Sequence, residues 1–174
     1  MDIRIDLSRL HLPKGNELNI ATSRALNHTL GKAVTAGNRA VTKDWNIKLK
    51  ELKPYVHTTK ATQYSHTAII RVKSRSISLS HFGARQLKRG VSFKLKKDKG
   101  RTTLKHTFIA KTKNGYVGVF KRKGRKRFPL NTFKSISPSS MYKTDGGKAV
   151  DEVIERDFNS RFIHELNRIA KPRL

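Results

Sequence analysis

Residues 91–120 read VSFKLKKDKGRTTLKHTFIAKTKNGYVGVF, and this stretch decides the fold class. Apolar and polar side chains alternate from 91 to 96, as they do along a half-buried strand. Residues 97–100 predict a turn into a second strand at 102–110, and Asn114-Gly115 predicts a tight turn into a third strand at 116–120. Strands joined by short turns pair in antiparallel fashion, so the middle of the chain predicts a mostly antiparallel sheet.

Two long amphipathic segments flank this β region. Between residues 18 and 42, apolar and small side chains recur every three or four positions, which is the pattern of one helix face. A second such face runs from 148 to 170 and stops before Pro172. Helix, sheet and helix in this order indicate an α+β fold. We expect a long N-terminal helix and a C-terminal helix packed on a mostly antiparallel, twisted β-sheet or small barrel.

The length of 174 residues favours a single domain over 1–174. We expect four parts: an N-terminal strand or arm at 1–17, a helical part at 18–53, a basic β region at 64–135 and a C-terminal helix at 147–171. The polar and apolar alternation of 2–7 predicts the strand. Gly146-Gly147-Lys148 faintly resembles the end of a phosphate loop, but Ala149 replaces the required Ser or Thr. It predicts a flexible entry to the last helix.

The charge of the chain is large and unevenly distributed. Its 39 basic and 12 acidic side chains give a formal net charge of +27. Residues 71–143 carry 22 basic side chains and one acidic side chain, Asp98, whereas 144–174 carry six of each. A solvated surface normally mixes both signs, so this middle segment predicts a strong positive field and a polyanionic or acidic partner.

Two basic clusters are the candidate binding residues. The partner-facing candidates of the first cluster are Arg85, Lys88, Arg89, Lys94, Lys96 and Lys97. Those of the second cluster are Lys121, Arg122, Lys123, Arg125, Lys126 and Arg127. A solvated face that keeps the protein soluble is the alternative interpretation. A phosphate backbone is the natural partner, bound by release of counterions without reading of bases, since no sequence-specific DNA- or RNA-binding signature is present.

Nothing in the sequence favours catalysis, a metal or a cofactor. Cysteine is absent, which rules out disulfides, thiolate zinc sites and cysteine nucleophiles. The seven histidines are scattered without metal-ligand spacing, and His164-Glu165 on the last helix is predicted to be a solvated face. No apolar run approaches the length of a membrane span, and the first six residues lack the pattern of a secretory signal. We therefore expect a non-enzymatic protein made in the cytoplasm that has no membrane partner.

Residues 82–93, FGARQLKRGVSF, resemble the signature of the phage minor tail protein Z family. The segments around them are similar to the family in the same order: RALN at 24–27, GVFKR at 118–122 and FNSRFIHEL at 158–166. The resemblance extends from about residue 1 to residue 170. One departure is the segment 129–139, where the family more often has an Arg-Leu-Pro-Ile-type run.

The resemblance implies a structural protein of the virion at the head-proximal end of a long phage tail, assembled in the host cytoplasm. Such tail completion or neck proteins are needed for joining of head and tail and for DNA passage. The implied partners are the tail terminator, the tail tube, the head-joining proteins and the genomic DNA in the tail lumen, with the chain in a homo-hexameric ring. On charge alone, the alternative is a sequence-non-specific nucleic-acid-binding protein. A nuclease is a third possibility, against which the shortage of carboxylates in the basic region argues.

Overall fold

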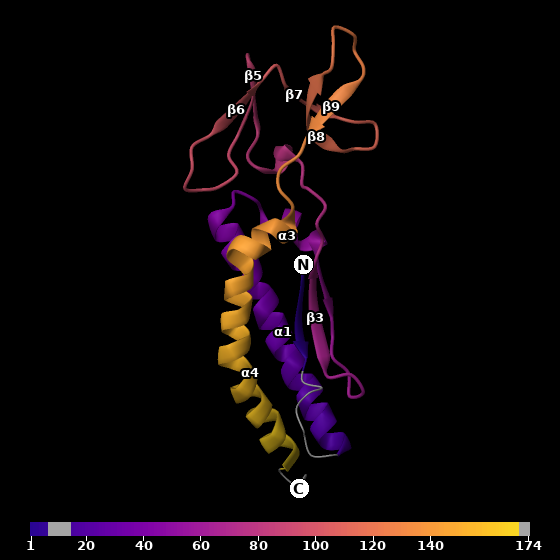
Figure 1. Cartoon of the computed structure of the whole chain (residues 1–174), viewed down its shortest axis with the longest axis vertical. Helices are drawn as coiled ribbons and strands as arrows, with labels where there is room; N and C mark the ends of the chain where they lie inside the picture. The colour runs from indigo at the N-terminus through magenta and orange to yellow at the C-terminus, as the bar shows by residue number, and fades with distance from the viewer. Residues whose placement is uncertain (7–14, 171–174) are drawn as a thin grey trace.

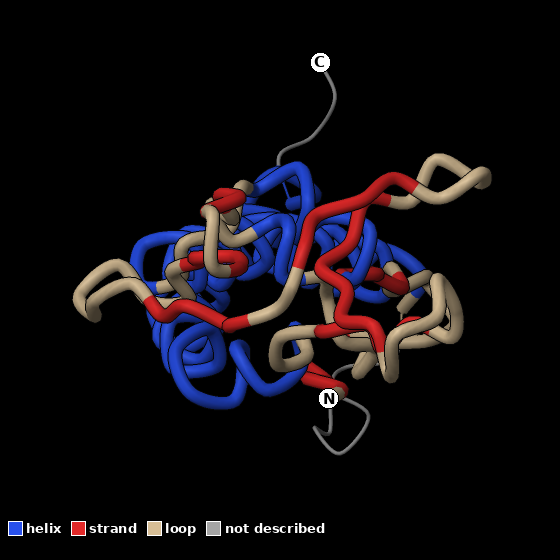
Figure 2. The backbone as a smooth tube through the Cα atoms, turned by 90° about the horizontal axis from the view of Figure 1, so that it is seen from above, coloured by secondary structure: helices blue, strands red, loops and turns tan. Residues whose placement is uncertain are grey.

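The computed structural model describes residues 1–6 and 15–170, and these residues form two lobes along one long axis. We call residues 85–134 the β lobe and the remaining described residues the helical lobe. Figure 1 shows the β lobe at one end of the long axis and the end of the last described helix at the other. Seen down this axis, strands and loops extend beyond the helices on two sides (Figure 2).

The order of elements confirms the α+β class. The helices and turns are α1 (Asn16–Asp44), α2 (Leu49–Leu52), α3 (Pro138–Met141), α4 (Gly147–Ala170), 3-10 segments at Lys53–Tyr55 and Leu79–His81, and a π-helical turn at Tyr142–Gly146. The strands are β1 (Asp2–Asp6), β2 (Val56–Thr59), β3 (Thr67–Val72), β4 (Arg85–Leu87), β5 (Gly90–Phe93), β6 (Thr102–Lys105), β7 (Phe108–Lys111), β8 (Val117–Arg122) and β9 (Leu130–Phe133).

The prediction of one sheet or small barrel is wrong, because the strands form three separate three-stranded antiparallel sheets. The first, β1-β3-β2, belongs to the helical lobe, whereas β4-β5-β6 and β7-β8-β9 build the β lobe. The break between the last two sheets falls within the strand predicted at 102–110. There His106 has a φ of 57°, in the left-handed region, and this turn sends the chain from one sheet into the next.

Both turns of the opening stretch are confirmed. β5 pairs with β6 across the turn at 97–100, and β7 pairs with β8 across Asn114-Gly115. Gly115 has a φ of 78°, which glycine adopts without steric cost. The N-terminal strand is also confirmed over Asp2–Asp6, which pairs with β3. Its predicted last residue, Leu7, lies outside the described residues.

α1 and α4 pack against each other along much of their length, and α1 also packs on β3. Small residues make the close approach of these elements possible. A Cβ at Gly37 would lie 2.8 Å from Cε1 of Tyr142, which is itself fully buried. The Tyr142 hydroxyl donates to Oδ1 of Asn38 at 2.8 Å, and burial raises the pKa of this phenol. The Tyr142 ring of the π-helical turn therefore fills the space beside Gly37 of α1 that a larger side chain would need.

Two expectations for the C-terminal helix are wrong. Residues 146–148 are not a flexible entry, because the π-helical turn runs directly into α4 and Gly146 lies against the Tyr142 ring. Glu165 is not on a solvated face, since its side chain is 1 % exposed. Arg161 lies 2.6 Å from one of its carboxylate oxygens and Arg168 lies 3.3 Å from the other. These arginines, one helical turn to either side, compensate the buried charge.

Candidate polyanion interface

The β lobe carries almost all of the unbalanced charge. Residues 85–134 contain 18 basic side chains and one acidic side chain, Asp98. The helical lobe contains 17 basic and 11 acidic side chains. Each ion pair among the described residues lies in the helical lobe, and no basic side chain of the β lobe has a carboxylate within 4.0 Å. The positive field predicted from the sequence is thus concentrated at one end of the molecule.

The second basic cluster occupies the outermost part of this end. Its six basic residues follow one another along the end of β8 and the loop to β9, and all are exposed. Figure 1 shows this loop projecting away from the helical lobe. The Arg127 guanidinium lies 5.7 Å from the ring centre of Phe128, which is 63 % exposed. The loop therefore presents cations and an aromatic side chain to solvent together.

The first cluster divides into two parts. Arg85, Lys88 and Arg89 are exposed, and Lys88-Arg89 forms the two-residue turn between β4 and β5. Lys94, which directly follows β5, is half-buried. The first three side chains are available to a partner without any rearrangement of the fold.

Lys96 and Lys97 contact the helical lobe instead. The Lys96 ammonium lies 4.9 Å from the ring centre of Trp45, and the Lys97 Nζ donates to the carbonyl of Thr42 at 2.6 Å. Thr42 lies in the last turn of α1, where exposed carbonyl groups favour a cation. These two lysines therefore join the lobes, a role that a run of lysines in the sequence does not indicate.

Asp145 completes this junction from the other side. It accepts a hydrogen bond from Trp45 Nε1 at 2.6 Å and one from Thr144 at 2.6 Å. Burial opposes ionisation of this carboxyl, but the two hydrogen bonds and the charge of Lys96 lower its pKa. Trp45 is thus held by Lys96 over the face of its ring and by Asp145 at its indole N–H.

The signature residues at 82–93 shape the β lobe besides placing Arg85, Lys88 and Arg89 on its surface. Gly83 has a φ of 61° and lies against Asn46, and its carbonyl accepts from Arg101 at 2.7 Å. A Cβ at Gly90 would lie 1.9 Å from the Leu104 carbonyl oxygen. Gln86 donates to the carbonyls of Leu87 and Gly90 at 3.0 and 3.1 Å. These contacts fix the turn that carries Lys88 and Arg89.

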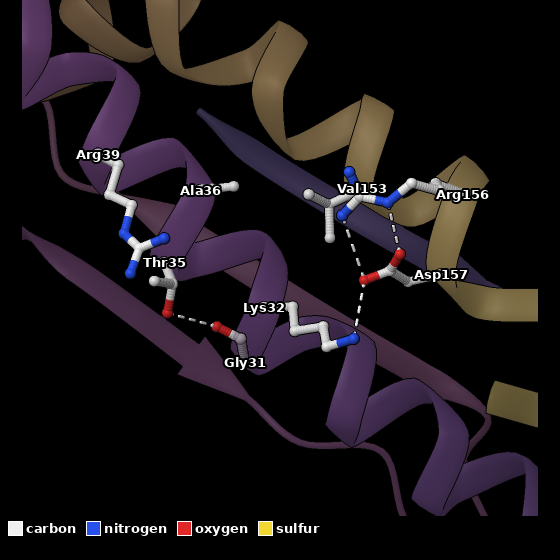
Figure 3. Close-up of a pocket in the computed structure, with 8 residues that line it drawn as sticks. All are labelled: Gly31, Lys32, Thr35, Ala36, Arg39, Val153, Arg156 and Asp157. Atoms are coloured by element: carbon white, nitrogen blue, oxygen red, sulfur yellow. Dashed lines mark hydrogen bonds and ion pairs between the residues drawn. The ribbon is translucent and has the colours of Figure 1, made fainter.

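A groove of about 330 Å³ lies between α1 and α4 in the helical lobe (Figure 3). Lys32 reaches Asp157 from α1 at 3.0 Å, and Arg156 contacts the same carboxylate at 2.7 Å. Hydrogen bonds from Arg156 and Lys32 lower the pKa of Asp157 to about 2. The Asp157 carboxylate thus joins Lys32 of α1 to Arg156 of α4 and cross-links the two helices beside the groove, whose third lining cation is Arg39.

Within residues 1–6 and 15–170, no three histidine or carboxylate side chains lie close enough to hold a metal ion together. None of the helices described here is both long and apolar enough to cross a membrane.

The family is established by sequence comparison. The profile described as prophage minor tail protein Z (GPZ) matches residues 6–172 of the chain. The chain therefore belongs to the prophage minor tail protein Z family, as the resemblance at 82–93 predicted, and is a structural component of a phage tail. No curated protein and no solved structure gives a significant match.

Proposed function

We propose that this minor tail protein is a tail completion component at the head-proximal end of the tail, where it takes part in head–tail joining and DNA passage. One observation carries this proposal: a lobe with 18 basic side chains, most of them exposed, and one acidic side chain forms one end of an elongated molecule. A tail conducts DNA, and a surface of this kind binds a phosphate backbone by releasing counterions. Family membership supports the tail, and the charge supports a position beside DNA.

The contacts of the β lobe with DNA are contacts with phosphates. The exposed cations lie at strand ends, in turns and in the loop after β8, and none belongs to a helix. Phosphate contacts position a protein on DNA but carry no information about sequence. DNA of any sequence can therefore move past this surface, as a conduit requires.

Assembly into a homo-hexameric ring requires a partner. Six copies carry roughly +162, and like charges of this size oppose closure of a ring. We expect the purified protein to remain monomeric at physiological salt and to form the ring on a partner surface, such as the tail terminator, or around DNA. Light scattering tests this. A stable hexamer of the isolated protein at micromolar concentration would contradict it.

The alternative is a sequence-non-specific nucleic-acid-binding protein that acts outside the virion. The exposed six-residue cluster favours it as much as it favours a conduit. The two functions differ in location. Detection of the protein at the head-proximal end of purified tails supports the first, and its absence from virions supports the second.

Joining of tails to heads in vitro tests the proposal. The variant replaces the six basic residues of the second cluster by glutamine. Tails that carry it should polymerise normally but join poorly to DNA-filled heads, because the phosphate contacts are lost. If joining to empty heads fails equally, the cluster binds an acidic neighbouring ring instead of DNA. Unchanged infectivity would overturn both versions and would show that the cluster is only a solvated face.

A further inference from the structure

A cavity of about 450 Å³ lies between two turns of the β lobe and is separate from the second basic cluster. It is lined by Lys88, Arg89, Gly90, Lys105, His106 and Thr107. Lys88 and Arg89 form the turn between β4 and β5, and Gly90 begins β5. Lys105 ends β6, and His106 and Thr107 connect it to β7. Three of these side chains are permanent cations, a fourth is an imidazole, and none is acidic.

Hydrogen bonds hold the two turns against each other. The His106 N–H donates to the Arg89 carbonyl at 3.0 Å. Gln86 ties both turns together, because its Nε2 donates to the carbonyls of Gly90 and Thr107 at 3.1 and 3.4 Å. The buried Thr107 hydroxyl accepts from the Val91 N–H at 3.1 Å. A site whose backbone is fixed in advance loses little entropy when a ligand binds.

The backbone at the cavity is also unusual. Gly90 has a φ of 149° and lies so close to β6 that no other side chain fits. His106 adopts the left-handed conformation without being glycine. Non-glycine residues hold such a conformation where their surroundings impose it, and these positions cluster at binding sites.

The composition of the lining selects the ligand. Lysine and arginine supply positively charged N–H donors, the imidazole supplies a further N–H donor, and the described lining offers no carboxylate to balance the charge. An anion with several acceptor oxygens satisfies such donors through charge-assisted hydrogen bonds. We propose that this cavity is a binding site for a phosphate group. The claim that this phosphate belongs to a DNA backbone rests on the proposed function. The claim that the cavity binds phosphate rests only on its lining residues.

Lys105 and His106 were not among the residues predicted from the sequence. Both fell inside the strand expected at 102–110, where alternate residues should point to opposite faces. The turn at His106 brings both residues into the lining of one cavity. Only the structure therefore joins them to Lys88 and Arg89.

A pair of triple variants tests whether the cavity acts as a site. The first variant is Lys88→Ala, Arg89→Ala and Lys105→Ala. The control is Lys99→Ala, Lys111→Ala and Lys113→Ala, which removes three exposed cations of the same lobe outside the cavity. Affinity for random-sequence duplex DNA is measured by fluorescence anisotropy, and the melting temperature confirms folding. Loss of specific charged hydrogen bonds should weaken the first variant about tenfold or more relative to the control.

Equal losses in the two variants would overturn the site, because only the general field of the lobe would then matter. That result leaves the proposed function intact, since DNA binding by the parent protein would persist. Failure of the parent protein to bind DNA even at low salt would instead remove the proposed function. The two failures are thus distinguishable.

NMR signals of the His106 ring identify the source of the phosphate. They are assigned by their loss in His106→Gly, a change that suits the left-handed backbone. Inorganic phosphate should shift them saturably, and chloride at equal ionic strength should not. A short duplex that shifts the same signals identifies the backbone of DNA, whereas a response to inorganic phosphate alone identifies free phosphate and overturns the DNA assignment. A response to neither overturns the site.

Discussion

The two lobes of this protein differ in what their side chains contact. The helical lobe balances 17 basic side chains with 11 acidic ones and buries a large apolar core around Leu26, Ile70 and Tyr142. The β lobe has 18 basic side chains against one acidic one, and its described core consists of Val91, Phe93 and Val119, on which Leu79 of the helical lobe packs. Stability therefore resides chiefly in the helical lobe, whereas the β lobe holds charge on short strands fixed by tight turns.

Gly90→Ala should have the largest effect and should act on the β lobe. A Cβ there would overlap the Leu104 carbonyl at 1.9 Å in a backbone conformation that alanine rarely adopts. We expect the free energy of unfolding to fall by about 2–6 kcal/mol, of which about 1–3 kcal/mol comes from backbone strain and about 1–3 kcal/mol from overpacking. Gly124→Ala is the matched control, because nothing lies within 4 Å of its Cβ.

Hydrogen exchange locates this damage. The amides of β5 and β6 should lose protection in Gly90→Ala while those of α1 and α4 keep theirs. Loss of protection throughout the molecule would show that the two lobes unfold as one unit. It would contradict the conclusion that stability resides chiefly in the helical lobe.

Within the helical lobe, truncation should lower the free energy of unfolding more at a fully buried position than at a half-buried one. Leu26 is fully buried, so Leu26→Ala should cost about 2–5 kcal/mol. Phe162 is half-buried and stacks on Phe158 with ring centres 5.9 Å apart. Phe162→Ala should therefore cost less than the about 3–5 kcal/mol of a fully buried phenylalanine. Thermal melting ranks the two, and a greater loss in Phe162→Ala would contradict the packing described here.

The smallest expected effect is the contribution of Asp157 to the pH dependence of stability. Its pKa is lowered from 3.8 to about 2, so its contribution to stability is present above pH 4 and is lost as the pH falls towards 2. In Asp157→Asn this part of the pH dependence should disappear. Denaturant unfolding of both proteins at pH 5 and pH 2.5 measures the difference. An unchanged pH dependence would show that neither Arg156 nor Lys32 holds the ionised Asp157 carboxylate in solution.

Local patterns predicted the elements well because neighbouring residues determine them. The face recurring between 18 and 42 became α1, and Asn114-Gly115 formed the expected turn. The division into three sheets could not be predicted in this way. The break between the second and third sheets falls at His106, which takes a backbone conformation that neither propensity nor alternation indicates.

The candidate site was predicted in part. Charge density identified the exposed cations of the second cluster, since long-range order is not needed to expose them. It could not separate Lys96 and Lys97, which bind Trp45 and the end of α1, from lysines that face solvent. It also missed the buried Glu165, because burial of a carboxylate depends on how the helices pack and on its arginine partners.

The most direct test of the account is the salt dependence of duplex DNA binding in three proteins. One is the parent, the second has the six basic residues of the second cluster changed to glutamine, and the third has six exposed basic residues of the helical lobe changed likewise: Lys43, Lys48, Lys53, Lys60, Lys73 and Arg75. Binding by the parent should fall with a log–log slope of about −0.9 per phosphate contacted. The β-lobe variant should show a flatter slope and the helical-lobe variant an unchanged one. Equal flattening in both variants would contradict the assignment of DNA contact to the β lobe.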